Sequence, residues 1–359
     1  MIQPIIRVLI VDDSAVSRQA LAMILEKDPS IQVIDEAADG KTAVRLAQQK
    51  KPDLIIMDII MPGMDGFEAT RIIMETHPVP ILIISGLVDP KEVKVLFKAM
   101  EAGALACMRK PPAPGHPQFE KEVRELIQTV KNLAGVSVVR RIPKEPPGEV
   151  SPSPSCLEKA RLSRIQLIAI GVSTGGPSIL NEILSKLPRT FPVPIVIVQH
   201  IASGFHEGFT EWLAQSSGYP VRLASDHEFL VPGTAYVAPD VFQMGVLQDL
   251  RVTLANAPPE NGLRPSVSYL FRSLASLPGG DVVAVILSGM GNDGAKELKV
   301  LRDKGAMTIA QDEKTSVVYG MPGEAVKLNA AESILTPQQI VGLFMRIANS
   351  RGDIKNEQR

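Results

Sequence analysis

A serine stands in a glycine-rich turn between an apolar run and a helical pattern, in the stretch LIAIGVSTGGPSIL at residues 167–180. Its neighbours, Gly171-x-Ser173-x-Gly175, match the G-x-S-x-G elbow, in which small residues allow a sharp strand-to-helix turn that exposes a hydroxyl. The turn also places Ser173 near a helix N-terminus, where free N–H groups can stabilise a developing oxyanion. The pattern predicts a nucleophilic serine.

A serine hydroxyl needs a base at neutral pH, and that base needs a carboxylate to fix its tautomer. His200 is the one histidine of five that directly follows an apolar strand pattern, VPIVIVQ, and Asp293 lies in a glycine-rich loop after a third such pattern. Taken alone, His200 is a structural histidine and Asp293 a turn former, and Ser288 is an alternative nucleophile. Three such groups at three strand ends favour catalysis, in an order along the chain that differs from that of α/β-hydrolases.

A phosphate-binding loop is the competing interpretation of the same glycines. GVSTGG lacks the Gly-Lys-Ser/Thr ending of a P-loop, and Ser173 stands where a dinucleotide fingerprint needs its second glycine. The next strand ends in Gln199 and His200 rather than in an acidic residue that could bind a ribose. The nucleotide-binding interpretation is therefore weak.

A second set of polar residues follows apolar runs in the N-terminal half. Asp12 and Asp13 end the first predicted strand, Asp58 the third, Ser85 the fourth and Lys110 the fifth. If these strands are neighbours, their carboxyl ends form one edge of a parallel sheet, which is where such sheets bind ligands. Clustered carboxylates repel one another unless a cation intervenes, and Mg²⁺ is the natural occupant.

The elements that must position these residues alternate between short apolar runs and helical patterns. Residues 1 to about 130 and 164 to about 348 both show this alternation, which is typical of an α/β fold with a parallel sheet covered on both faces. The stretch at residues 222–256 has shorter strands and tight turns, which suggest an antiparallel insertion. Between the halves, a segment rich in Pro, Ser and charge predicts an extended linker.

Composition limits the classes of function. A chain of 359 residues predicts two domains, and 38 basic against 39 acidic residues provide no general attraction to nucleic acid. Cys107 and Cys156 do not form a disulfide framework. Arg7 interrupts the apolar N-terminus, which rules out a signal peptide, and no apolar run approaches the ~18 residues of a membrane span. We expect a cytoplasmic protein.

The N-terminal motifs VLIVDDS, PDLIIMDIIMPGMDG, IISG and MRKP resemble the receiver domain of two-component response regulators, which has a flavodoxin-like fold. The resemblance implies that Asp58 accepts a phosphoryl group from a histidine kinase, with Mg²⁺ bound by Asp12, Asp13 and Asp58. Ser85 corresponds to the switch hydroxyl and Lys110 to the lysine that contacts the phosphate. Phosphorylation would add about −1.5 to −2 charge, enough to rearrange the loop after Ser85.

The C-terminal motifs AIGVSTGGP, VQH, GLRPSV, LSGMGNDG and AQDEKTSVVYGMP resemble the catalytic domain of chemotaxis protein-glutamate methylesterase/protein-glutamine glutaminases, whose fold is Rossmann-like. The resemblance implies that Ser173, His200 and Asp293 are nucleophile, base and orienting acid. The backbones of Thr174 and Met290 are the candidates for oxyanion contacts. The esterase reaction needs no cofactor. The stretch SDHEFL and the residues Gln243 and Ser268 depart from the family pattern.

The combined resemblance implies hydrolysis of glutamate γ-methyl esters on chemoreceptors and deamidation of receptor glutamines, in adaptation of chemotaxis signalling. It also implies that the receiver covers the active site until it is phosphorylated. The expected partners are methyl-accepting chemoreceptors and a chemotaxis histidine kinase, with no nucleic acid, no membrane insertion and a monomeric chain. We expect a receiver at 1–133, a linker at 134–163, a catalytic domain at 164–350 and a flexible tail at 351–359.

Three alternatives stay open. A response regulator with a DNA-binding second half is disfavoured by the size and α/β pattern of that half and by the lack of a short basic helical module. A nucleotide-binding enzyme is disfavoured by the degraded glycine motif. A degenerate adaptor that binds receptors without catalysis can be separated from the esterase by an activity assay.

Overall fold

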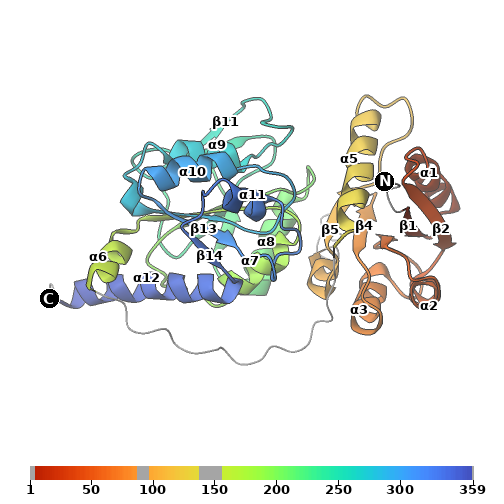
Figure 1. The fold of residues 1–359 in the computed structure, drawn as a ribbon, viewed down its shortest axis with the longest axis horizontal. Helices are drawn as coiled ribbons and strands as arrows, with labels where there is room; N and C mark the ends of the chain where they lie inside the picture. Colours follow the sequence, from red (N-terminus) through yellow and green to blue (C-terminus); the bar gives the residue numbers. More distant parts are fainter. Residues whose placement is uncertain (1–4, 87–96, 137–155, 358–359) are drawn as a thin grey trace. The chain divides into compact units, whose positions relative to one another are not determined.

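Strands alternate with helices along the whole of the described chain. The structure, a computed structural model, describes residues 5–86, 97–136 and 156–357. Two units are distinguished, residues 1–144 and 145–359 (Figure 1). Each unit contains a parallel sheet with helices, as the alternating pattern predicted.

The N-terminal unit has a five-stranded parallel sheet in the order β2-β1-β3-β4-β5. Its strands are β1 (Ile6–Val11), β2 (Ile31–Ala37), β3 (Leu54–Asp58), β4 (Ile81–Ser85) and β5 (Ala106–Arg109). The helices with described bounds are α1 (Ala15–Leu25), α2 (Gly40–Lys50), α3 (Gly66–Thr76) and α5 (Phe119–Leu133). Residues 97–102 are helical as well, directly after the gap in the described residues. This strand order is that of flavodoxin-like folds.

Side-chain caps explain where three of these helices begin. Ser14, Asp39 and Asp65 have extended backbones, and each side chain accepts a hydrogen bond from an N–H of the first helical turn. Such a cap pairs one of the N–H groups that a helix leaves unsatisfied, and is worth about 1 kcal/mol. Each cap lies just after a strand, so the caps also determine where the loops at this edge of the sheet end.

The C-terminal unit has a seven-stranded parallel sheet in the order β14-β13-β12-β6-β7-β9-β8. Its strands are β6 (Leu167–Val172), β7 (Ile195–Gln199), β8 (Val221–Leu223), β9 (Ala235–Val237), β12 (Val282–Ile286), β13 (Met307–Gln311) and β14 (Ser333–Leu335). The central strands β6, β7 and β12 are buried at every position, as expected for a sheet covered on both faces. β6 lies between β7 and β12. The strands that follow β6 along the chain are therefore placed on both sides of it, and this reversal of strand order is a topological switch point.

The segment predicted as an antiparallel insertion is divided between two sheets. β8 and β9 extend the main sheet in parallel, because β9 pairs with β7 and β8 with β9. The strands β10 (Gln243–Val246) and β11 (Val252–Ala255) form a separate antiparallel ribbon. The antiparallel prediction is therefore right for the ribbon and wrong for the two edge strands.

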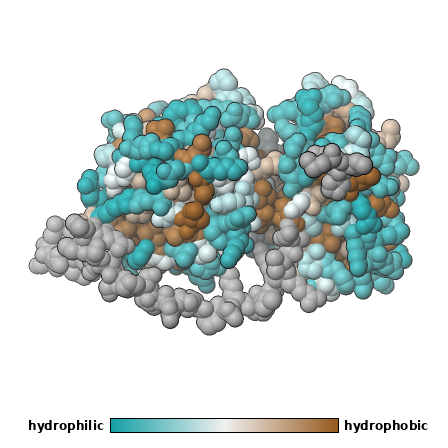
Figure 2. All heavy atoms as spheres, viewed as in Figure 1, coloured by the Kyte–Doolittle hydropathy of each residue, from teal (hydrophilic) through white to brown (hydrophobic). Residues whose placement is uncertain are grey.

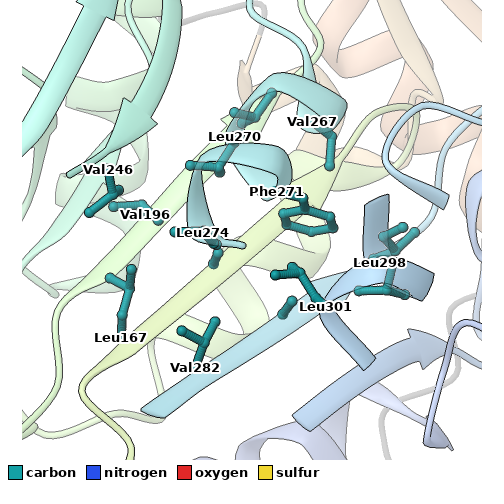
Figure 3. Close-up of a cluster of buried hydrophobic side chains, with 14 of the residues drawn as sticks. Leu167, Val196, Val246, Val267, Leu270, Phe271, Leu274, Val282, Leu298 and Leu301 are labelled. Carbon is teal, nitrogen blue, oxygen red and sulfur yellow. The ribbon is translucent and has the colours of Figure 1, made fainter. Parts of the chain in front are cut away.

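Seven α-helices accompany the second sheet in the described residues. They are α6 (Cys156–Arg164), α7 (Gly176–Leu184), α8 (His206–Ser217), α9 (Val267–Leu274), α10 (Ala295–Asp303), α11 (Met321–Lys327) and α12 (Pro337–Glu357), with one 3₁₀ turn, η1 (Gly279–Asp281). Side chains of α9 and α10 pack on one face of the sheet (Figure 3). The packed residues include Leu270, Phe271, Leu274, Leu298 and Leu301 against Leu167, Val196 and Val282.

Both α6 and the end of α12 are helical where the sequence predicted irregular chain. α6 occupies the last part of the expected linker, and Arg161 on it forms a paired contact with the Glu332 carboxylate, at 2.5 and 2.7 Å. α12 continues to Glu357 through the segment expected to be a frayed tail. Arg351 donates to the carbonyls of Ser163 and Pro192, at 3.2 and 2.9 Å. Long-range contacts thus stabilise helices whose local sequence is mostly polar.

The face of the molecule seen in Figure 2 is mainly polar. Figure 2 shows a largely hydrophilic face with smaller apolar groups among the polar ones. Among the helices of the described ranges, none combines the length and the apolar character that crossing a bilayer would require.

Candidate active site and phosphoacceptor site

Ser173 lies in the tight turn between β6 and α7. The N–H of Gly176 donates to the Ser173 carbonyl at 2.9 Å, which closes the turn. Gly175 has φ +81° and ψ −6°, the geometry that the third position of a type II turn requires and that only glycine adopts without strain. The two glycines after Thr174 therefore produce the sharp elbow, and Ser173 is half-buried at its start.

Strand register places His200 beside Ser173. β6 and β7 are parallel neighbours with Val172 paired to Gln199, so the next residue of each strand is Ser173 and His200. The N–H of His200 donates to the Val172 carbonyl at 2.9 Å, which extends the ladder to this point. Within the described residues the Ser173 hydroxyl forms no hydrogen bond to the imidazole. Such catalytic contacts often tighten when substrate binds.

Asp293 meets the imidazole of His200 directly. Its Oδ2 lies 2.9 Å from His200 Nε2, across 93 residues of chain. The carboxylate also accepts from the N-terminus of α9, where the N–H groups of Val267 and Ser268 donate at 2.7 and 3.0 Å and the hydroxyl of Ser266 at 2.9 Å. Asp293 is buried, with 2 % of its surface exposed. A buried carboxylate with four donors is held in one orientation.

Electrostatics keep this carboxylate ionised. Burial alone would raise the pKa of Asp293, but the hydrogen bond and charge of His200, with the donors of Ser268 and Val267, lower it to about 2. The ionised carboxylate can only accept a hydrogen bond from Nε2, so the neutral imidazole has its hydrogen on Nε2. Nδ1 is then the nitrogen left to accept the proton of a nucleophile.

The proposed oxyanion contacts lie around the same turn. An added Cβ on Gly289 would come within 2.6 Å of Ser173 Cβ, so the loop that carries Met290 runs directly against Ser173. The Ser173 N–H is occupied, because it donates to the Ser288 carbonyl at 3.0 Å. The N–H groups of Thr174 and Met290 donate to no acceptor in the described part of the chain. Neither group is thus committed to another acceptor in the described residues.

Ser288, the alternative nucleophile, has a structural role. It is fully buried, and its hydroxyl donates to the carbonyl of Thr174 at 2.8 Å. The same oxygen accepts from the N–H of Val318 at 2.9 Å. Ser288 therefore ties the turn of Ser173 to the loop after β13 and has no access to a substrate.

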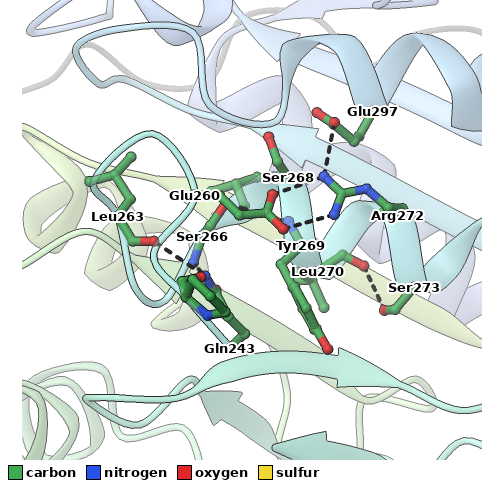
Figure 4. A network of polar contacts seen from close by, with 12 residues as sticks. Gln243, Glu260, Leu263, Ser266, Ser268, Tyr269, Leu270, Arg272, Ser273 and Glu297 are labelled. Carbon is green, nitrogen blue, oxygen red and sulfur yellow. Dashed lines mark hydrogen bonds and ion pairs between the residues drawn. The ribbon is translucent and has the colours of Figure 1, made fainter. Parts of the chain in front are cut away.

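The sequence interpretation missed the residues that orient Asp293. Ser266 is the N-cap of α9, a role that serine before a helical pattern signals in general, but its contact with Asp293 spans 27 residues. Gln243, at the start of β10, accepts from the Ser266 N–H at 2.8 Å and donates to the Leu263 carbonyl (Figure 4). Gln243 and Ser268, which were expected to depart from the family pattern, are therefore hydrogen-bonding partners within this network.

An arginine links the helix that holds Asp293 to the helix that follows it. Figure 4 shows Arg272 of α9 between Glu260 and Glu297. Its guanidinium contacts both oxygens of Glu260 at 2.8 Å and Glu297 of α10 at 3.3 Å. Two charged partners on separate segments restrain α9 more than a single surface pair would.

The acidic residues of the N-terminal unit converge as the sequence predicted. The order β1-β3-β4-β5 makes the four relevant strands consecutive neighbours. Oxygens of Asp12, Asp13 and Asp58 lie within 4.8 Å of one another. Lys110 Nζ contacts Asp12 Oδ2 at 2.6 Å and Asp58 Oδ2 at 3.1 Å. Ser85 ends β4 and is buried. Its carbonyl accepts a hydrogen bond from the Lys110 N–H, so it lies at the same edge of the sheet.

Charges in this cluster oppose one another. Burial raises the pKa of Asp58, and the charge of Asp12 adds to this effect, whereas Lys110 counteracts it. Burial alone would lower the pKa of Lys110, but its contacts with Asp12 and Asp58 outweigh burial and raise it. One lysine thus compensates only part of the negative charge of three carboxylates, which leaves an environment suited to a cation.

Comparison with known proteins identifies both units. Residues 8–116 match the response regulator receiver domain, and residues 168–344 match the CheB methylesterase family. A protein-glutamate methylesterase/protein-glutamine glutaminase of Geobacter metallireducens is 50 % identical over 344 residues, covering 96 % of this chain and 99 % of the relative. A relative of the same name from Nitrosospira multiformis is 46 % identical and covers 98 % of this chain and 99 % of its own length.

Among solved structures, the CheB methylesterase catalytic domain of Thermotoga maritima is 36 % identical, with a TM-score of 0.48, and covers 50 % of this chain and 98 % of its own. The relatives match nearly end to end, and the family models match on either side of the segment between the units. The chain therefore belongs to the CheB methylesterase family, with a response regulator receiver domain in its N-terminal half.

Proposed function

We propose that this chain hydrolyses glutamate γ-methyl esters on chemoreceptors and deamidates receptor glutamines, with Ser173, His200 and Asp293 as its catalytic triad. The relatives are named for both activities. The observation that carries the assignment is the 2.9 Å contact between His200 Nε2 and Asp293 Oδ2, at the end of the strand beside Ser173. A serine, an imidazole and a buried carboxylate in this order constitute a nucleophile, its base and the residue that orients the base.

The geometry supports a two-step mechanism. Ser173 Oγ attacks the ester carbonyl while His200 Nδ1 accepts its proton, and Asp293 stabilises the imidazolium. The N–H groups of Thr174 and Met290 stabilise the oxyanion. The imidazolium returns the proton to the departing methoxide, which leaves as methanol and yields an acyl-serine. Water, deprotonated by His200, then releases the glutamate, and ammonia replaces methanol when the substrate is a glutamine.

The proposed control resides in the N-terminal unit. Asp58 is the phosphoryl acceptor and a chemotaxis histidine kinase the donor, with Lys110 as the phosphate contact and Ser85 as the switch hydroxyl. Phosphorylation is proposed to relieve inhibition of the esterase by the receiver. The added charge of about −2 appears beside Ser85, at the point where the loop after β4 begins.

A magnesium ion fits the carboxylates at this site. Asp12, Asp13 and Asp58 offer oxygen ligands within 4.8 Å of one another, and the raised pKa of Asp58 reflects burial and repulsion that a cation would relieve. Bound there, Mg²⁺ would neutralise charge on the phosphoryl group during transfer. Lys110 contacts two of the three carboxylates, which supports its proposed contact with the phosphate.

The proposed division of labour follows the expected boundaries. Residues 1–133 would act as the receiver and 164–350 as the catalytic domain, joined by 134–163 and followed by 351–359. The enzyme is expected to be monomeric and cytoplasmic. Its expected partners are the chemoreceptors, as substrates, and the kinase, as phosphoryl donor.

Methanol release from membranes that contain methylated chemoreceptors tests the proposal, with and without acetyl phosphate and Mg²⁺. We expect Ser173→Ala to abolish release, whereas Ser276→Ala, which removes an exposed hydroxyl from the same unit, leaves it unchanged. Asp58→Asn should remove stimulation by acetyl phosphate but retain basal release. A wild-type chain that releases no methanol under any condition would instead be a non-catalytic adaptor.

A further inference from the structure

Gln199 contacts the backbone of both residues proposed as nucleophile and base. It ends β7 and is buried, with 2 % of its surface exposed. Its amide Nε2 donates to the Ser173 carbonyl at 2.9 Å and to the His200 carbonyl at 2.8 Å. One side chain thus joins the turn after β6 to the loop after β7.

The two acceptors determine the orientation of this amide. Both are carbonyl oxygens, so only an NH₂ group can face them. The other end, Oε1, is buried and has no hydrogen-bond partner in the described residues. An unpaired buried oxygen costs free energy that an apolar side chain of the same shape would avoid. Packing therefore does not explain a glutamine here, whereas the two donated bonds do.

The end of the strand ladder shows what these bonds add. The last sheet hydrogen bond between the two strands is from the His200 N–H to the Val172 carbonyl. Past this bond, the chain turns away into α7 on one side and into the loop that leads to α8 on the other. The amide of Gln199 connects the two segments where the sheet no longer does.

We propose that Gln199 is a positioning residue, which keeps the turn of Ser173 and the backbone of His200 in the relative placement that proton transfer requires. The inference rests on the proposed triad and extends it to a residue that touches no substrate. Displacement of a reacting group by about 1 Å can reduce the rate by about 10²-fold. Loss of the amide should therefore lower kcat and leave KM nearly unchanged, because the substrate contacts remain.

Gly176 provides an independent way to disturb the same amide. An added Cβ at this position would lie 2.1 Å from Gln199 Oε1 and 2.7 Å from Val172 Cγ2. Gly176→Ala must therefore push the glutamine away from its present place without removing its amide. If Gln199 acts as proposed, Gly176→Ala lowers the rate in the wild-type chain and has little further effect in a Gln199→Ala background.

The test uses the full chain and two readouts, which are labelling of Ser173 by a fluorophosphonate probe and methanol release from methylated receptors. Gln199→Met keeps the shape of the side chain and removes the donors. We expect about 10²-fold slower labelling and a similar loss of kcat. Thr308→Val is the matched control, since it removes the hydroxyl of another buried side chain, which accepts from the Glu332 N–H at 3.0 Å near the N-terminal end of β13. It should label at the wild-type rate.

The outcomes separate this inference from the proposed function. A wild-type chain that is not labelled, or a Ser173→Ala chain that is, would overturn the triad itself. A labelled wild type with equally fast labelling of Gln199→Met would overturn the role of Gln199. A rise in KM with unchanged kcat would also contradict it, since that result indicates a binding role. If Gln199→Met does not fold, Gly176→Ala and the double variant Gly176→Ala with Gln199→Ala decide between the same outcomes.

Discussion

Replacement of Asp293 by asparagine is the sharpest test of the proposed catalytic geometry. The carboxylate has donors on both sides, with the N–H of Val267 and His200 Nε2 at Oδ2, and the N–H of Ser268 at Oδ1. An asparagine must direct its NH₂ group to one side and therefore toward a backbone N–H. If the NH₂ group takes the present position of Oδ2, it faces His200 Nε2. That nitrogen can then form a hydrogen bond with it only by accepting.

The consequence for His200 is a change of tautomer. An imidazole that accepts at Nε2 has its hydrogen on Nδ1 and cannot take the proton of Ser173. In the serine-hydrolase template this error costs about 10⁴ in kcat, or about 5.5 kcal/mol of transition-state stabilisation. In the opposite orientation of the asparagine, the NH₂ group faces the N–H of Ser268, and both groups are donors. An unpaired buried donor costs about 1–3 kcal/mol of stability. We expect both a lower rate and a lower melting temperature for Asp293→Asn.

Methanol release at saturating methylated receptor, with circular dichroism to establish folding, measures the effect. The control is Asp303→Asn, the same chemical change at an exposed position of α10, and it should keep the wild-type rate. If folded Asp293→Asn retained more than a tenth of the wild-type kcat and also melted at the wild-type temperature, neither asparagine orientation would have its expected cost and the reasoning would be refuted.

Three further predictions concern stability and the neighbouring loops. Ser288→Ala removes the acceptor of the half-buried Val318 N–H, so it should lower the free energy of unfolding by about 1 kcal/mol while retaining measurable methanol release; complete loss of release in a folded variant would restore Ser288 as a candidate nucleophile. Val241 is a β-branched residue with a strained φ of +60°, and 48 % of its surface is exposed. Val241→Gly relieves this strain and should raise the free energy of unfolding, measured by chemical denaturation, by about 1 kcal/mol. A decrease would contradict a strained backbone. The pKa of Asp293 is lowered from 3.8 to about 2, so its charge stabilises the fold above pH 3.8 by about 2 kcal/mol, and this contribution is lost as the pH falls toward 2. The difference in stability between the wild type and Asp293→Asn should therefore be constant above this range and shrink by about 2 kcal/mol within it, as acid titration of both chains can measure.

Residues that follow strands were the most predictable part of the site. Ser173, His200 and Asp58 each come directly at or after the end of an apolar run, and the structure places each at the end of a buried strand. The prediction works because buried parallel strands have a simple signature and because their carboxyl ends lie along one edge. The same logic placed Lys110 and Ser85 beside the acidic residues.

Residues that act across the fold were not predictable in this way. Ser266 signals the start of a helix, but nothing local indicates that its helix points at Asp293. Gln199 reads as the polar end of a strand, and its two carbonyl partners appear only in three dimensions. α6 was missed because its local sequence is mostly polar, and its contact between Arg161 and Glu332 joins residues 171 positions apart.

The sequence alone was sufficient for the α/β alternation, the two halves, the glycine-rich elbow and the types of reactive side chains at the strand ends. These features depend on periodicity and on backbone preferences within a few residues. The tertiary structure decided that β6 lies between β7 and β12, that Nε2 rather than Nδ1 of His200 faces Asp293, and that the N-terminus of α9 holds that carboxylate. Those contacts join segments far apart in the chain, so they follow from strand order and packing rather than from local preference.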